Sequence, residues 1–184
     1  ERTSNHHSES SARLHRHLRR LMHSVNSSRV KDIAELSGFR CGVAAIDDII
    51  SHCLPDTMAD SGRKIYVVRR EGEETVISIF VLSHGDLELD TIDLNEIKGD
   101  YSDVDDSDIR RYHYDALEID LLAVRESERY GHIGRHVIEI IKDNRQRLGF
   151  EKALFILVDA YFEDGYNAIP FYDKCGFRRT FQHA

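Results

Sequence analysis

The hydrophobic and polar positions of the chain alternate most regularly near its middle. Apolar side chains occupy every second position from Leu117 to Leu121, and Glu118 and Asp120 fill the positions between them. A period of two is typical of a half-buried β-strand. We therefore predict a strand over Ala116–Val124.

After this strand, the pattern changes to helical spacing. The polar stretch Arg125–Glu128 and the glycine-containing loop Arg129–Arg135 lead into an amphipathic helix that Gly149 ends with a left-handed cap. The apolar positions of that helix are Val137, Ile138, Ile140, Ile141 and Leu148. Ala153–Val158 is apolar throughout, which predicts a central strand buried on both faces. Strand, helix and strand then form one right-handed βαβ unit.

The amino-terminal half contains further β-rich runs. Lys64–Arg70 and Thr75–Ser83 predict an antiparallel hairpin. Val30–Leu36 predicts a first strand, with a helical turn as the alternative. Ala44–Leu54 predicts a helix that stops near Pro55.

At the carboxyl end we expect a short helix from about Ala168. Asn167 is its predicted N-cap, Pro170 falls in the first turn and Gly176 ends it. Phe177–Phe181 then predicts a last short strand. Together these elements give the fold class α/β, with a mixed, mostly antiparallel sheet that contains one parallel βαβ unit.

The chain divides into a basic arm and one domain. Residues 1–12 are polar and expected to be disordered, and Leu14–Val25 has the spacing of an amphipathic helix. We expect a flexible basic arm over residues 1–29 and a single domain over residues 30–184. The arm helix packs on the domain or on a second subunit of a homodimer, or else it contacts RNA or an acidic partner.

Composition narrows the function further. Of the 184 residues 41% are hydrophobic and 32% charged, and the net charge is −8. No apolar run approaches the about 20 residues that cross a bilayer. Three cysteines without a C-x-x-C pair argue against a disulfide framework or a metal site. We expect a cytoplasmic protein without metal or membrane contact, which binds nucleic acid only through its basic arm.

One stretch is strongly acidic. Asp86–Asp108 holds ten acidic residues and a single base, Lys98. One interpretation is a solvated loop. The other is a lip that attracts a cationic substrate.

The loop Arg129–Arg135 is a candidate anion site. Backbone N–H groups and the helix dipole at such a position attract phosphate. Together with the downstream segment Asn167–Phe177, the loop resembles the acyl-CoA-binding half of the GNAT superfamily of N-acetyltransferases.

In that superfamily an R/Q-x-x-G-x-G/A loop holds the CoA pyrophosphate, and an N-x-x-A-x-x-F-Y-x-x-x-G-F segment carries a tyrosine beside the CoA sulfur. The first pattern matches here at Arg129 and Gly134, while His132 stands at its middle glycine. The second pattern is kept from Phe171 to Phe177, with two residues fewer between Asn167 and Phe171 than in the pattern as written.

The resemblance implies transfer of an acetyl group from acetyl-CoA to a primary amine by direct attack. Tyr172 would protonate the thiolate, and Glu118, or alternatively Asp120, would accept the amine proton through water. The implied co-substrate contacts are Leu122, Ala123 and Val124 for the pantetheine arm, Arg129, Tyr130, Gly131, His132, Ile133, Gly134 and Arg135 for the pyrophosphate, and Asn167.

Two other functions stay open. The stretch Phe39-x-Cys41-Gly42 followed by Ile46-Asp47 is similar to a GNAT branch that includes toxins acetylating aminoacyl-tRNA, which implies an antitoxin partner. A CoA-binding or regulatory module without catalysis is the third possibility. From the acidic stretch we expect a cationic acceptor, either a small molecule or a peptide.

Overall fold

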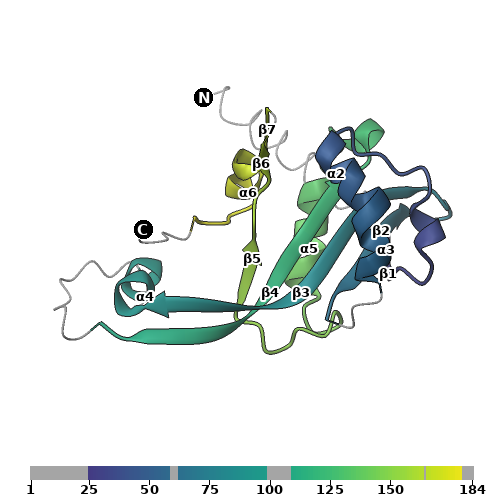
Figure 1. Ribbon diagram of the computed structural model, residues 1–184. Helices are drawn as coiled ribbons and strands as arrows, with labels where there is room; N and C mark the ends of the chain where they lie inside the picture. The colour runs from purple at the N-terminus through teal and green to yellow at the C-terminus, as the bar shows by residue number, and fades with distance from the viewer. Residues whose placement is uncertain (1–24, 59–61, 99–108, 164, 180–184) are drawn as a thin grey trace, which may run out of the picture.

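The computed structural model describes residues 25–58, 62–98, 109–163 and 165–179, and a five-stranded sheet forms its centre (Figure 1). Its strands, in spatial order, are β1 (Val25–Arg29), β2 (Lys64–Arg70), β3 (Val76–Asp90), β4 (Arg111–Val124) and β5 (Phe155–Val158). The first three pairings are antiparallel and β4 runs parallel to β5. The predicted mixed sheet with one βαβ unit is confirmed.

Helical elements cover both faces of the sheet. One core cluster joins the sheet to α5 (Ile133–Asp143) and α6 (Ile169–Lys174). The cluster on the opposite face packs beneath η1 (Ile33–Leu36), α2 (Ala44–Asp48), η2 (Ile49–Cys53) and α3 (Leu54–Thr57). A separate ribbon of β6 (Phe162–Glu163) and β7 (Tyr166–Asn167) lies beside α6 (Figure 1). Within the described ranges, no helix is long and apolar enough to cross a membrane.

The first strand lies earlier than predicted. β1 begins at Val25, which we had assigned to the arm helix, so the sheet starts before the expected boundary at residue 29. The strand predicted over Val30–Leu36 is wrong, and its alternative, a helical turn, is found at η1. Asp32 and Glu35 form a reciprocal capping box that starts this turn. The rest of the arm, residues 1–24, lies outside the described residues.

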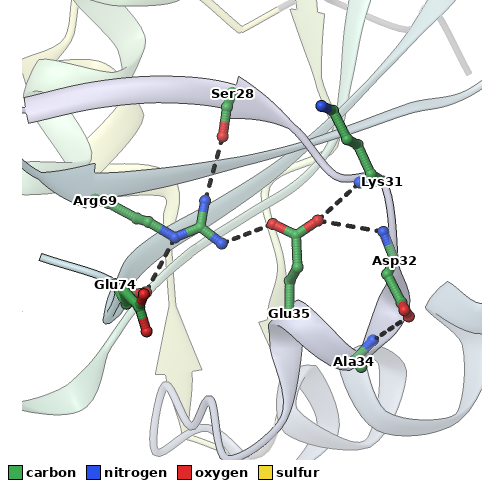
Figure 2. Close-up of polar contacts among 7 residues, drawn as sticks. All are labelled: Ser28, Lys31, Asp32, Ala34, Glu35, Arg69 and Glu74. Atoms are coloured by element: carbon green, nitrogen blue, oxygen red, sulfur yellow. Dashed lines mark hydrogen bonds and ion pairs between the residues drawn. The ribbon is translucent and has the colours of Figure 1, made fainter.

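Glu35 also ties η1 to the sheet (Figure 2). Its carboxylate accepts hydrogen bonds from the Lys31 and Asp32 amides and pairs with Arg69 of β2 at 2.7 Å. Arg69 also donates to Ser28 of β1 at 3.2 Å. The pKa of Glu35 lies below its usual value, first because of the Lys31 hydrogen bond and then because of Arg69.

The helix predicted to stop near Pro55 continues to Thr57. Proline has no N–H and crowds the preceding turn, so it normally ends an α-helix. Here the five residues before α3 form the π-helical turn η2, and Pro55 enters the first turn of α3, where no amide donor is required.

The acidic stretch is not a simple loop. β3 continues to Asp90, α4 (Thr91–Lys98) follows, and β4 already begins at Arg111. The outer parts of β3 and β4 form a long hairpin extension that reaches away from the body of the sheet (Figure 1). Cross-strand pairs hold it, because Arg111 lies 3.1 Å from Glu88 and His113 lies 2.8 Å from Asp86. The remainder of the stretch, residues 99–108, lies outside the described residues.

The carboxyl-terminal half follows the prediction with several differences. α5 ends at Asp143 and not at Gly149, and the N-cap of α6 is Ala168 and not Asn167. Gly149 and Gly176 adopt the expected left-handed conformation, with φ of +84° each. β5 is an edge of the described sheet and is half-buried, so the expectation of burial on both faces is wrong. Ile140 is half-buried, and Leu148 is buried beyond the end of α5. Phe177–Arg179 has no regular structure, and the remaining residues of that predicted strand lie outside the described ranges.

Candidate functional site

Strand β4 carries an irregularity that its sequence pattern hides. In β4, Leu121 pairs with Val81 and Ile119 pairs with Leu82, so Asp120 is an extra residue in a β-bulge. As a result Ile119 packs on the α5 face of the sheet, whereas Leu121 packs on the opposite face. The uninterrupted alternation had predicted both on one face.

Beyond the bulge, the parallel strands separate. The pairing of β4 with β5 ends at Ile119 and Val158, although β4 runs on to Val124. The space between them is a cleft of about 760 Å³. Its lining comes from β4, the α5 loop, residues 159–162 and α6 on one side, and from residues 41–49 on the other.

The loop before α5 opens into this cleft. His132 precedes the helix with φ of +60°, and it is the one non-glycine residue with left-handed φ in the described part of the chain. Its carbonyl accepts the amide of His136, so the N–H groups of Ile133, Gly134 and Arg135 precede the helical ladder. The Gly131 amide is taken, because it donates to Glu128 at 3.0 Å.

The arginines at this end of the cleft have different roles. Arg129 lines the cleft but donates a hydrogen bond to the carbonyl of Cys41. Arg125 donates to Val76 and Gly38 at 2.7 and 3.2 Å. Arg135 lines the cleft, is largely exposed and lies 3.5 Å from Glu139. Arg129 and Arg135 thus both line the cleft and are exposed, and Arg129 is the one of these two that donates to a backbone carbonyl.

The stretch Phe39-x-Cys41-Gly42 has a structural explanation. The Asp47 carboxylate accepts the Cys41 and Gly42 amides at 2.7 and 3.2 Å. On the other side Arg129 binds the Cys41 carbonyl. This small network fixes the segment against the α5 loop and places residues 41–49 in the cleft wall. The sequence offered a signal in the spacing of these residues, but not their contact with the loop.

Tyr172 of α6 lines the cleft from a buried position. Burial raises the pKa of its phenol well above the usual value, with smaller contributions from Tyr166 and Cys175. The ring packs edge-on against Phe171 and Phe177, with centroid distances of 5.0 and 5.4 Å. Tyr172 therefore stays a neutral, protonated phenol at ordinary pH.

Carboxylates gather where β4 and β5 separate. Asp120 and Asp159 line the cleft, and Asp120 accepts from Ser83 at 2.8 Å and lies 3.3 Å from Arg63. Glu118 lies beside them but is outside the lining. Burial, and then repulsion from Asp120 and Asp159, raises its pKa.

Eight of the predicted co-substrate and catalytic residues meet in this cleft: Leu122, Ala123, Val124, Arg129, His132, Gly134, Arg135 and Tyr172. The other five do not line it. Tyr130 is almost fully exposed, Ile133 belongs to the core and Asn167 accepts the Ile169 amide at 2.9 Å. Gly131 and Glu118 flank the cleft without lining it.

The described part of the acidic stretch, residues 86–98, does not line this cleft. Three of its carboxylates, on Glu88, Asp93 and Glu96, line a second groove of about 1090 Å³ between the β3–β4 hairpin extension and β5. The part of the lining that the sequence did not predict is mainly apolar and comes from both sides of the cleft. It includes Val43, Ile46, Ile49, Tyr161, Phe162 and Tyr166. In the sequence these side chains cannot be told from core residues.

No protein-family profile matches the sequence, and no curated protein matches it. Solved structures do match. AtaTR bound with AcCoA is 18% identical, covers 88% of this chain and 90% of its own, and has a TM-score of 0.60. A tyrosine-to-phenylalanine mutant of KacT is 16% identical, with coverages of 88% and 91% and a TM-score of 0.60. AtaT complexed with acetyl-methionyl-tRNAfMet is 17% identical, with coverages of 84% and 86% and a TM-score of 0.56.

At such identities the likeness concerns the fold. The chain has the fold of the GNAT-superfamily acetyltransferases, as the loop and the Asn167–Phe177 segment indicated.

Proposed function

We propose that the chain is an N-acetyltransferase that moves an acetyl group from acetyl-CoA to a primary amine. One observation carries the proposal. The cleft brings together three features: the backbone of β4 beyond Ile119, which has no β5 partner; the start of α5; and the Tyr172 phenol. The GNAT fold supports the same function.

The cleft suits the parts of acetyl-CoA. The peptide groups of Leu122–Val124 have no partner on the β5 side, so a pantetheine arm can pair with them as an added strand would. The amides of the first turn of α5 and the Arg135 guanidinium can hold the pyrophosphate. Arg129 supports this loop from behind through Cys41.

Each proton and charge of the transfer has a candidate group. A β4 amide would stabilise the carbonyl oxygen as it gains charge. Tyr172 would protonate the departing thiolate. Asp120, with Glu118 behind it, would accept the amine proton through water, because Asp120 lines the cleft and Glu118 does not.

The acceptor is less closely defined. The expectation of a cationic amine rested on the acidic stretch, and three of its described carboxylates, on Glu88, Asp93 and Glu96, line the other groove. The described part of the stretch therefore does not support it. A second candidate is the amine of an aminoacyl-tRNA. The Cys41–Asp47 network and the likeness to AtaT, a toxin solved with acetyl-methionyl-tRNAfMet and with the antitoxin AtaR, favour it.

Calorimetry with acetyl-CoA tests the proposal. We expect saturable binding, followed by release of free CoA when a mixture of primary amines is added. A flat titration would contradict the proposed transfer, whereas saturable binding without release of CoA would leave a CoA-binding or regulatory module as the better interpretation.

For the aminoacyl-tRNA candidate, binding to tRNA should weaken with salt. It should be lost when residues 1–24 are deleted if the basic arm is the contact. The deletion has to stop there, because β1 begins at Val25.

A further inference from the structure

Exposed apolar side chains form a lip at one end of the cleft. Ile49 of η2 is 37% exposed, Phe162 of β6 is 64% exposed and Tyr166 of β7 is 39% exposed. All three line the same cleft, although they come from opposite walls. Figure 1 shows η2's neighbour α2 and the β6–β7 ribbon at the same end of the sheet. Exposed apolar residues that gather around one cleft indicate a binding surface, whereas single exposed apolar residues scattered over a surface do not.

The lining behind the lip is also apolar. Val43, Ile46 and Leu121 continue it inward, and they belong to the core cluster opposite α5. The basic side chains of the cleft come mainly from the α5 and α6 side, with Arg135 and Lys174. The cleft thus has basic side chains around the α5 loop and α6, proposed above for the phosphates, and an apolar lip with an apolar lining behind it.

The carboxylates in the lining do not change this division. Asp120 is paired with Arg63 and Ser83, and Asp159 stands at the end of β5. Neither lies on the elements that form the lip. A polycationic acceptor whose second charge reached the lip would place it against apolar side chains, which costs free energy.

We propose that this lip selects primary amines that bear an apolar or aromatic group next to the amine. The inference rests on the proposed acetyl transfer and defines its acceptor. It concerns the substituent beside the reacting nitrogen, so it applies to a small amine and to an aminoacyl ester alike. The lip residues act on specificity, because they contact the substituent and not the reacting atoms.

A homologous series of acceptors tests the inference. Glycinamide, alaninamide, leucinamide and phenylalaninamide share one amine and differ in the apolar side chain, and spermidine supplies the polycation. Each fully buried methylene contributes about fourfold, so kcat/KM should rise at least about tenfold from glycinamide to leucinamide. The gain should fall mainly in KM, because the side chain is bound equally before and during the reaction.

Matched variants locate the effect. Ile49→Asn is compared with Ile92→Asn, whose side chain on α4 is 42% exposed, and Phe162→Ser with Leu154→Ser, which is 67% exposed. The lip variants should flatten the series while retaining turnover of glycinamide, which shows that they fold. The α4 and β5-side controls should keep the wild-type slope.

Three results would overturn the inference: a flat series in the wild type, preference for spermidine, or the same slope in lip and control variants. These outcomes differ from failure of the proposed function. In that case the protein neither binds acetyl-CoA nor acetylates any amine, glycinamide included.

Discussion

The ring of Phe171 packs directly against Gly134, at the crossing of α6 and α5. A Cβ at position 134 would lie 3.1 Å from the Phe171 Cζ atom and 3.5 Å from the Val124 side chain. The close approach keeps the start of α5, the end of β4 and the neighbouring Tyr172 in one rigid group. Gly134 is therefore required for packing as well as for access to the loop.

Gly134→Ala should lower the free energy of unfolding by about 1–3 kcal/mol through overpacking. Adding Phe171→Leu should recover part of that loss, and a double-mutant cycle in urea measures the coupling. Gly134→Asp adds charge to bulk and should abolish acetyl-CoA binding in calorimetry. Normal binding by a folded Gly134→Asp protein would contradict the site.

His132 holds a backbone conformation that suits glycine better. With φ at +60°, the left-handed conformation costs an ordinary residue about 1–2 kcal/mol. His132→Gly should relieve this strain, offset in part by the greater freedom of glycine in the unfolded chain. We expect unchanged or slightly higher stability and unchanged or tighter acetyl-CoA binding. A tenfold loss of affinity would instead assign a ligand contact to the imidazole.

The elements that sequence predicted correctly are those with a local signal. The hairpin, the βαβ unit and the glycine after α6, Gly176, each follow from local spacing. The left-handed conformation of Gly149 was also predicted, but α5 ends before it, at Asp143. The bulge at Asp120 leaves no such signal in the sequence. Apolar and polar residues still alternate there, although Ile119 and Leu121 lie on opposite faces of the sheet. The β3–β4 hairpin extension was not predicted because acidic residues dominate Asp86–Asp90. Its cross-strand partners Arg111 and His113 lie further along the sequence.

The candidate site divides in the same way. The α5 loop and Tyr172 were found by motif, and both line the cleft. The apolar wall, with Ile49 and Phe162, was missed because its composition equals that of a core. Its role depends on where β4 and β5 separate, which is a property of the tertiary structure.

Tyr172→Phe tests the proposed acid. The ring contacts with Phe171 and Phe177 remain, so the fold and acetyl-CoA affinity should be kept. Turnover should fall by about 10²-fold, the lower range for a general acid. Because burial raises the pKa of the phenol, Tyr172 should stay protonated between neutral pH and pH 9, and its deprotonation should cause no loss of activity in that range. Equal losses of affinity and turnover would identify a packing residue.

Glu35 provides a test of stability. Its pKa is lowered in the folded protein, so its contribution is fully present above the unfolded value of 4.5 and is lost as pH falls through the folded value. At pH 7, Glu35→Gln should lower stability by about 1 kcal/mol through the cap and the Arg69 pair. In thermal unfolding, the difference from wild type should shrink as pH falls below 4.5 and vanish once pH is below the folded value. Glu73→Gln, in the exposed turn between β2 and β3, is the matched control.

Glu118 and Asp120 should set the acidic limit of activity. The pKa of Glu118 is raised by burial and then by the neighbouring carboxylates, so Glu118 takes up a proton at a higher pH than an ordinary glutamate. A base acts in its deprotonated form, so kcat/KM should fall as pH drops through this raised pKa. Glu118→Gln removes that titrating group, so the acidic limb should move to lower pH. Asp120→Asn should instead reduce the plateau itself. If both variants keep the wild-type profile, the amine loses its proton to solvent and neither carboxylate is the base.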